Sequence, residues 1–139
     1  MSVFKKKKPN NCYTYFRIVG DFDPDNISQK LDLQPFEVLK KNQQRKNGTK
    51  YDFSAWHFGQ CNIYNIDTAC QMEETIQQLK NKVNILNDIQ REYDVSFYLE
   101  IVPCLFSYNT KPTLSPSLDV IDFCHATRTE IDIDLYIYE

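Results

Sequence analysis

The sequence is poor in glycine, with only three among its 139 residues. Because tight hairpin turns depend on glycine, or on Asn and Asp in its place, this scarcity disfavours a sandwich built from many short hairpins. No apolar run approaches the roughly 18 residues of a membrane-spanning helix, and Lys5 to Lys8 are followed by Pro9-Asn10-Asn11 where a signal peptide would need an apolar stretch. We therefore expect a cytoplasmic protein without membrane contact.

The five cysteines form no C-x-x-C pair, which argues against a disulfide framework and a zinc knuckle, and predicts reduced thiols. With only two histidines as well, we predict no metal site and no cofactor. Asp21, Asp23 and Asp25 alternate as in a calcium loop, but Asn26 stands where glycine is needed and Asp32 where a bidentate glutamate is needed. We interpret Asp23 as a helix cap instead.

Charge is distributed unevenly along the chain. Residues 1–50 carry eleven Lys and Arg against five Asp and Glu, whereas residues 51–139 carry five against fourteen. The first part is therefore a candidate basic surface, and the rest is acidic. The length and the 42% hydrophobic content predict one α+β domain over residues 12–139, preceded by a flexible basic tail over residues 1–11.

Apolar periodicity predicts the elements of the first half. Residues 12–19 are β-branched or aromatic and alternate, so we expect a strand with Phe16 and Ile18 facing the core. Asp23-Pro24 begins a short helix that ends near residue 31. Residues 36–50 are predicted to form a long basic hairpin or loop around Asn47-Gly48, and residues 53–58 a second strand.

The second half continues the alternation of helices and strands. A long amphipathic helix is predicted from Asp67 to about residue 93, with a bend near Asn84. A strand over residues 95–101 is limited by Pro103, and a short strand follows at 105–108. A helix begins at Ser115-Pro116 and ends near Ala126. Its predicted inner face consists of Leu118, Ile121 and Cys124.

The last strand is predicted to place four apolar residues on one face, Ile131, Ile133, Leu135 and Ile137, and to alternate them with Asp132, Asp134, Tyr136 and Tyr138. The resulting order of elements predicts an α+β fold, in which a mainly antiparallel sheet carries its helices on one face as a sandwich of ferredoxin-like type.

Several motifs carry a family resemblance: Tyr15-Phe16-Arg17-Ile18, Gly20-Asp21, Asp23-Pro24-Asp25, Asn47-Gly48, Ser54-Ala55-Trp56 and Ile131-Asp132-Ile133-Asp134-Leu135-Tyr136. Together they resemble the bacterial family known as domain of unknown function 4279, over residues 13–138. The resemblance implies a small, stand-alone domain and brings no activity or catalytic residue set. The chain departs from the pattern in its lysine-rich tail and at Asn42-Gln43-Gln44, which interrupt the basic pair before Asn47-Gly48.

The leading functional hypothesis is a non-catalytic domain that binds another protein, in the manner of an antidote to a toxin. The candidate binding residues lie in the basic loop and on two strands: Lys40, Lys41, Arg45, Lys46, Lys50, Trp56, Tyr136 and Tyr138. A homo-oligomer that pairs through the last strand is left open.

Two alternative functions are kept. The basic 40–50 loop could bind nucleic acid or a small ligand, since lysines neutralise phosphates and aromatic rings stack on bases. An enzyme would instead use His57 or His125 and would need a carboxylate beside one of them. Cys124 and His125 are helix neighbours that point about 100° apart, so they do not form a nucleophile and base pair.

Overall fold

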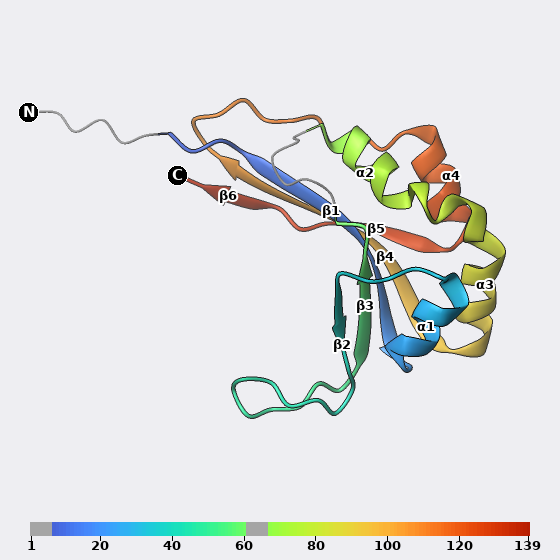
Figure 1. The fold of residues 1–139 in the computed structure, drawn as a ribbon. Coiled ribbons are helices and arrows are strands. Elements are labelled where there is room, and N and C mark those ends of the chain that lie inside the picture. The colour runs from blue at the N-terminus through green and yellow to red at the C-terminus, as the bar shows by residue number, and fades with distance from the viewer. Residues whose placement is uncertain (1–6, 61–66) are drawn as a thin grey trace, which may run out of the picture.

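The computed structural model describes residues 7–60 and 67–139, and Figure 1 shows the arrangement of their elements. In chain order these are β1 (Asn11–Asp21), α1 (Pro24–Leu31), β2 (Glu37–Leu39), β3 (Ser54–Phe58), α2 (Thr68–Gln77), the 3-10 turn η1 (Lys80–Lys82), α3 (Val83–Glu92), β4 (Asp94–Phe106), α4 (Leu118–Ala126), β5 (Thr129–Ile133) and β6 (Tyr136–Tyr138). The predicted single-domain α+β fold is confirmed.

The strands form one sheet in the order β2-β3-β1-β4-β5, and β6 pairs with β4 beyond the end of β5. The pairs β1–β3, β1–β4 and β2–β3 are antiparallel, whereas β5 and β6 both run parallel to β4. The sheet is therefore mixed and open. The narrower expectation of a ferredoxin-like arrangement is not confirmed.

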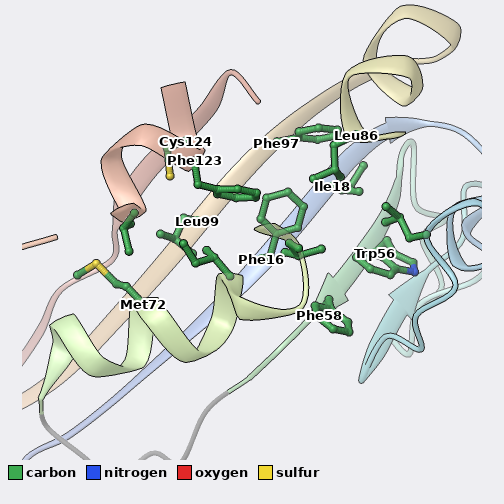
Figure 2. Close-up of a cluster of buried hydrophobic side chains, with 14 of the residues drawn as sticks. Phe16, Ile18, Trp56, Phe58, Met72, Leu86, Phe97, Leu99, Phe123 and Cys124 are labelled. Atoms are coloured by element: carbon green, nitrogen blue, oxygen red, sulfur yellow. The ribbon is translucent and has the colours of Figure 1, made fainter. Parts of the chain in front are cut away.

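All four α-helices lie on the same side of the sheet, as Figure 1 shows. Between them and the strands lies a core that includes Phe16, Trp56, Phe97, Leu99 and Phe123, drawn in Figure 2. The strand residues that alternate with these core positions point to the other side of the sheet, which we call the open face. Phe16 and Ile18 are fully buried, as their alternation in β1 predicts.

The cap predicted for α1 is confirmed. The carboxylate of Asp23 accepts a hydrogen bond from the backbone N–H of Asp25, and Pro24 occupies the first turn. The second helix, α2, is joined to β1 by buried polar contacts as well as by apolar packing. The side-chain amide of Gln71 donates to the carbonyl oxygen of Cys12 at 2.7 Å, and the hydroxyl of Thr14 donates to Gln71 Oε1 at 3.2 Å.

Pro103 does not end β4, contrary to the prediction. The strand continues to Phe106, and Pro103 of β4 lies opposite Cys12 of the neighbouring strand β1. Proline keeps an extended backbone and removes only one N–H donor, so the remaining pairs on both sides hold the strand in register. The long helix between residues 67 and 93 is also divided earlier than predicted, because α2 ends at Gln77 and a 3-10 turn precedes Val83.

The inner face of α4 differs from the prediction. Val120, Phe123 and Cys124 are buried, whereas Leu118 and Ile121 are 78% and 43% exposed. The helix carries two neighbouring apolar stripes, and its packing against β5 and α2 buries only one of them. Ser117, and not Ser115, caps this helix by accepting a hydrogen bond from the N–H of Val120.

The single last strand that the sequence predicts is divided into two strands in the structure. The first, β5, ends at Ile133, and the second, β6, begins at Tyr136. The predicted apolar face is 37 to 60% exposed at the residues Ile131, Ile133, Leu135 and Ile137. Both strands form the edge of the sheet, so these side chains have neighbours on one side only.

The segment before β1 is attached to the loop that follows β4. Lys8 donates from its backbone N–H to the hydroxyl of Tyr108, and Asn10 Oδ1 accepts from the backbone N–H of Phe106. Of the predicted flexible tail, residues 1–6 lie outside the described part of the chain. Within the described ranges, no helix combines the length and apolar character needed to cross a membrane.

Candidate functional site

The register of the strands brings charged and aromatic side chains into two rows on the open face. One row crosses five strands in the order Glu37, His57, Arg17, Tyr98 and Glu130. The next row, two residues along each strand, holds Tyr15, Glu100 and Asp132. Residues far apart in the sequence thereby become lateral neighbours, because paired residues on adjacent strands point to the same side of a sheet.

His57 meets a carboxylate in the first row. Its Nδ1 lies 2.7 Å from Glu37 Oε1, and its ring lies 5.1 Å from the ring of Tyr15 and 6.0 Å from that of Phe36. Burial lowers the pKa of His57, and the hydrogen bond and charge of Glu37 offset part of that effect. A neutral imidazole at pH 7 then donates Nδ1–H to Glu37 and leaves Nε2 as a hydrogen-bond acceptor.

The geometry of His57 bears on the enzyme hypothesis. An imidazole oriented by a carboxylate is the arrangement of a general base. However, the His57 side chain is only 8% exposed, and Nε2 is a buried atom without a hydrogen-bond partner among the described residues. Since a base must reach the proton that it removes, the folded pair of Glu37 and His57 offers no accessible base. His125 lies exposed on α4, in the helical layer.

Glu100 is the most buried carboxyl group of the open face, at 5% exposure. Among the described residues it forms an ion pair with Arg17, whose Nη1 lies 3.9 Å from Glu100 Oε1, which is too far for a hydrogen bond. Burial, a hydrogen bond with Asp132 and the negative charge of Asp132 raise the pKa of Glu100 to about 8, while Arg17 opposes this shift. At pH 7 Glu100 is therefore mainly protonated.

Other groups on this face also experience a negative potential. Burial and the charge of Glu100 raise the pKa of Tyr15 to about 12, and burial together with Cys104 and Asp134 raises that of Tyr13. The thiol of Cys104 has its pKa raised by burial and by Asp134. The acidic residues thus outweigh the positive charge of Arg17 in their effect on Tyr15 and Glu100.

Aromatic rings share the open face with these acids. The rings of Tyr13 and Tyr15 stack with centroids 6.1 Å apart, and the ring of Phe36 meets Tyr15 edge-on at 5.6 Å. Further along β4, the ring of Phe106 lies 5.4 Å from that of Tyr138. The open face is therefore both acidic and aromatic.

The two tyrosines predicted as binding residues lie on this face. Tyr136 and Tyr138 are 44% and 47% exposed, and they pair with Cys104 and Phe106 of β4. The hydroxyl of Tyr136 donates to Asp134 at 3.0 Å. Their use in binding stays a prediction.

The basic loop lies away from these tyrosines, in the projecting segment between β2 and β3 that Figure 1 shows. Lys41 Nζ lies 3.1 Å from Asp21, and Lys40 Nζ lies 3.8 Å from Asp25. Arg45 lies over the ring of Tyr51 at 4.4 Å.

The remaining predicted lysines of this loop, Lys46 and Lys50, are exposed. Part of the positive charge of the loop is neutralised, because Lys40 and Lys41 are paired with Asp25 at the start of α1 and Asp21 at the end of β1. Binding by the loop stays a prediction.

Trp56 does not belong to a binding surface. Its side chain is completely buried, its ring stacks on that of Phe58 at 5.3 Å, and Nε1 donates to Ser28 Oγ at 3.0 Å. The alternation of β3 places Trp56 and His57 on opposite faces, and the helices cover the face of Trp56.

Sequence reasoning missed Arg17, Glu37 and Glu100 as members of one site. Their outward positions follow from strand alternation, but their proximity depends on strand order and register. Within the described residues, no group of three or more His, Cys, Asp or Glu side chains is placed to hold a metal ion. Cys104 and Cys124 are free thiols, whereas Cys61 lies outside the described residues.

The fold and its open face define a class: a single-domain α+β protein in which all the helices of the described residues lie on one side of a mixed sheet. A comparison with protein-family models matches residues 10–138 to Domain of unknown function (DUF4279). The chain therefore belongs to this family, as the sequence motifs predict. Neither a search of curated proteins nor a search of solved structures found a match.

Proposed function

We propose that this protein is a non-catalytic, cytoplasmic binding domain that contacts another protein through its open face. The observation that carries the proposal is the combination of exposed aromatic side chains with an excess of acidic groups on one uncovered side of the sheet. Tyrosine is enriched at protein interfaces because it combines a large apolar ring with a polar hydroxyl. The antidote to a toxin is a narrower form of the same proposal.

The charge of the face favours a protein over a nucleic acid. Phosphate backbones are bound by Lys and Arg, whereas here the carboxylates of Asp132 and Asp134 outweigh Arg17. The basic loop offers the exposed side chains of Lys46 and Lys50, but this loop projects between β2 and β3, away from the strand β6 that carries the exposed tyrosines (Figure 1). The nucleic-acid alternative is consequently less well supported.

The test is affinity capture from cells of the native host with matched variants. Tyr136→Ser combined with Tyr138→Ser removes two exposed rings from the open face, and Leu118→Ser combined with Ile121→Ser removes two exposed apolar side chains from α4. We expect a partner that is retained by the wild type and by the α4 variant, and is reduced at least about tenfold with the tyrosine variant.

Equal recovery of that partner with all three proteins would overturn the proposal, as would a loss confined to the α4 variant. Circular dichroism of each variant verifies its fold. Because all four replaced side chains are exposed, we expect each substitution to change stability by less than about 1 kcal/mol.

A further inference from the structure

We propose that the open face receives a cationic side chain of its protein partner, a guanidinium or an ammonium group, against the ring of Tyr15 and the carboxyl groups of Glu100 and Asp132. This inference rests on the function proposed above and specifies the chemistry that the partner must present. It also assigns Glu100 a role that neither the family match nor the fold suggests.

The placement of three side chains carries the inference. Tyr15, Glu100 and Asp132 are consecutive in one row across β1, β4 and β5. Asp132 is exposed, Tyr15 is half-buried and Glu100 lies deepest, at 5% exposure. A cation that contacts the Tyr15 ring and the Asp132 carboxylate therefore lies above Glu100. Aromatic rings and carboxylates are the two groups that bind such cations most favourably.

Among the described residues, Arg17 forms an ion pair with Glu100. Their contact of 3.9 Å is longer than a hydrogen bond, and Arg17 keeps 28% of its side chain exposed, so this pair neutralises the cluster only in part. In place of a second cation, Glu100 holds a proton. Since Asp134 adds to the negative potential, an incoming guanidinium supplies the charge that the site lacks.

Binding is therefore linked to proton release. The cation stabilises the carboxylate form of Glu100, and the carboxyl proton passes to solvent. The groups facing Glu100 are Tyr13, Tyr15 and Arg17 from β1, with Asp132 and Asp134 from the edge of the sheet.

Among the groups of the open face whose pKa values are shifted, Glu100 is the one that titrates within the window from about pH 6.5 to 9. The pKa of His57 is lowered below this window, whereas those of Tyr13, Tyr15 and Cys104 are raised above their ordinary values near the top of the window or beyond it. A change of affinity in this window that is lost in Glu100→Gln therefore reports on Glu100.

The experiment uses the full chain and a capped decapeptide of alternating Arg and Gly, because arginine stays charged throughout the window. Amide chemical shifts in an NMR titration report the site, and a Glu-Gly decapeptide is the charge control. We expect the Arg peptide to perturb the amides of Tyr15, Glu100 and Asp132, and the Glu peptide to leave them unchanged. The affinity for the Arg peptide is expected to rise about tenfold between pH 6.5 and 8.

Two variants, each with an amide in place of a carboxyl group, identify the group responsible. Glu100→Gln keeps the shape of the protonated side chain, and we expect it to abolish the rise in affinity with pH. Asp122→Asn removes a carboxylate from the exposed surface of α4 and is expected to retain the rise. A wild-type affinity that does not change between pH 6.5 and 9, or the same rise in Glu100→Gln, would overturn the inference.

Partner capture separates this inference from the function on which it rests. Capture that depends on Tyr136 and Tyr138 but does not differ between the wild type and Glu100→Gln at either pH 6.5 or pH 8 overturns the cation site and leaves the binding domain standing. Capture that is insensitive to all three residues overturns the proposed function itself.

Discussion

The indole Nε1 of Trp56 donates a hydrogen bond to Ser28 Oγ at 3.0 Å, and this bond joins β3 to α1 through the core. Ser28 Oγ in turn donates to the carbonyl oxygen of Pro24. The tryptophan is completely buried, so its N–H has no access to water when the serine oxygen is removed. The contact makes Trp56 a structural residue.

The first prediction concerns this contact. Ser28→Ala leaves a buried indole N–H without its acceptor, and we expect the free energy of unfolding to fall by about 1–2 kcal/mol. Trp56→Phe also removes buried ring volume and is expected to cost about 2–4 kcal/mol. Urea denaturation followed by circular dichroism measures both. Ser107→Ala, at an exposed position, is the control and should change stability by less than about 0.5 kcal/mol.

The second prediction follows from the raised pKa of Glu100, about 8 in the folded protein. The folded state holds this proton more tightly than the unfolded state, so the associated stability is complete below the unfolded pKa near 4.5 and is lost as the pH rises through about 8. These two pKa values correspond to a loss of up to about 4 kcal/mol between pH 5 and 8.5. Glu100→Gln cannot lose a proton and should be less sensitive to pH over this range.

Urea denaturation at pH 5, 7 and 8.5 provides the measurement for Glu100. The lowered pKa of His57 acts in the opposite direction, because the unfolded state takes up a proton below its pKa near 6.5 whereas the buried ring does so only at a lower pH. The difference between wild type and Glu100→Gln removes this common contribution. An identical pH profile for the two proteins contradicts the assignment of the proton to Glu100.

The third prediction compares two glycines. A Cβ added to Gly20 in β1 would lie 2.1 Å from the carbonyl oxygen of Asp94, so Gly20→Ala requires β1 and β4 to separate. Gly48 has a φ of +86° but no atom within 4 Å of the position of an added Cβ. We expect Gly48→Ala to cost about 1 kcal/mol through backbone strain, and Gly20→Ala to cost more than about 3 kcal/mol. Thermal unfolding measures the loss of stability in both variants. An equal loss of stability in Gly20→Ala and Gly48→Ala would refute the steric explanation.

The fourth prediction addresses the basic loop. Since Lys40 and Lys41 are paired with Asp25 and Asp21, we expect weak retention on an immobilised polyanion such as heparin, with elution below about 0.15 M salt. Replacing Lys40, Lys41, Arg45 and Lys46 by Gln should lower the elution position only slightly. Strong retention that this variant abolishes would instead support the nucleic-acid alternative.

Local signals predicted the first half of the fold well. The alternation around Phe16 and Ile18 identifies the core face of β1, and Asp23-Pro24 marks the start of α1, because both depend on residues that are close in sequence. The prediction that Pro103 ends the strand was wrong, since the effect of a proline on a strand depends on the residue pairs around it. The predicted burial of Leu118 and Ile121 was also wrong, because either of two apolar stripes could have faced the core.

The candidate site was predicted only in part. Tyr136 and Tyr138 could be placed on a polar face by alternation within the last segment of the chain. Trp56 was predicted to be a binding residue, because its position in a strand does not show which side of the sheet the helices cover. The meeting of His57 with Glu37, and of Glu100 with Asp132, depends on pairing between strands that lie far apart in the sequence.

The sequence by itself determined the α+β class, the family, the cap of α1 and the faces of the central strands, since periodicity and capping act over a few residues. Only the tertiary structure decided that Trp56 is buried, that Lys40 and Lys41 are paired with aspartates, and that Tyr15, Glu100 and Asp132 form one row. The physical reason is that sheet order and register bring residues together across the chain, and burial among those neighbours sets the protonation of Glu100.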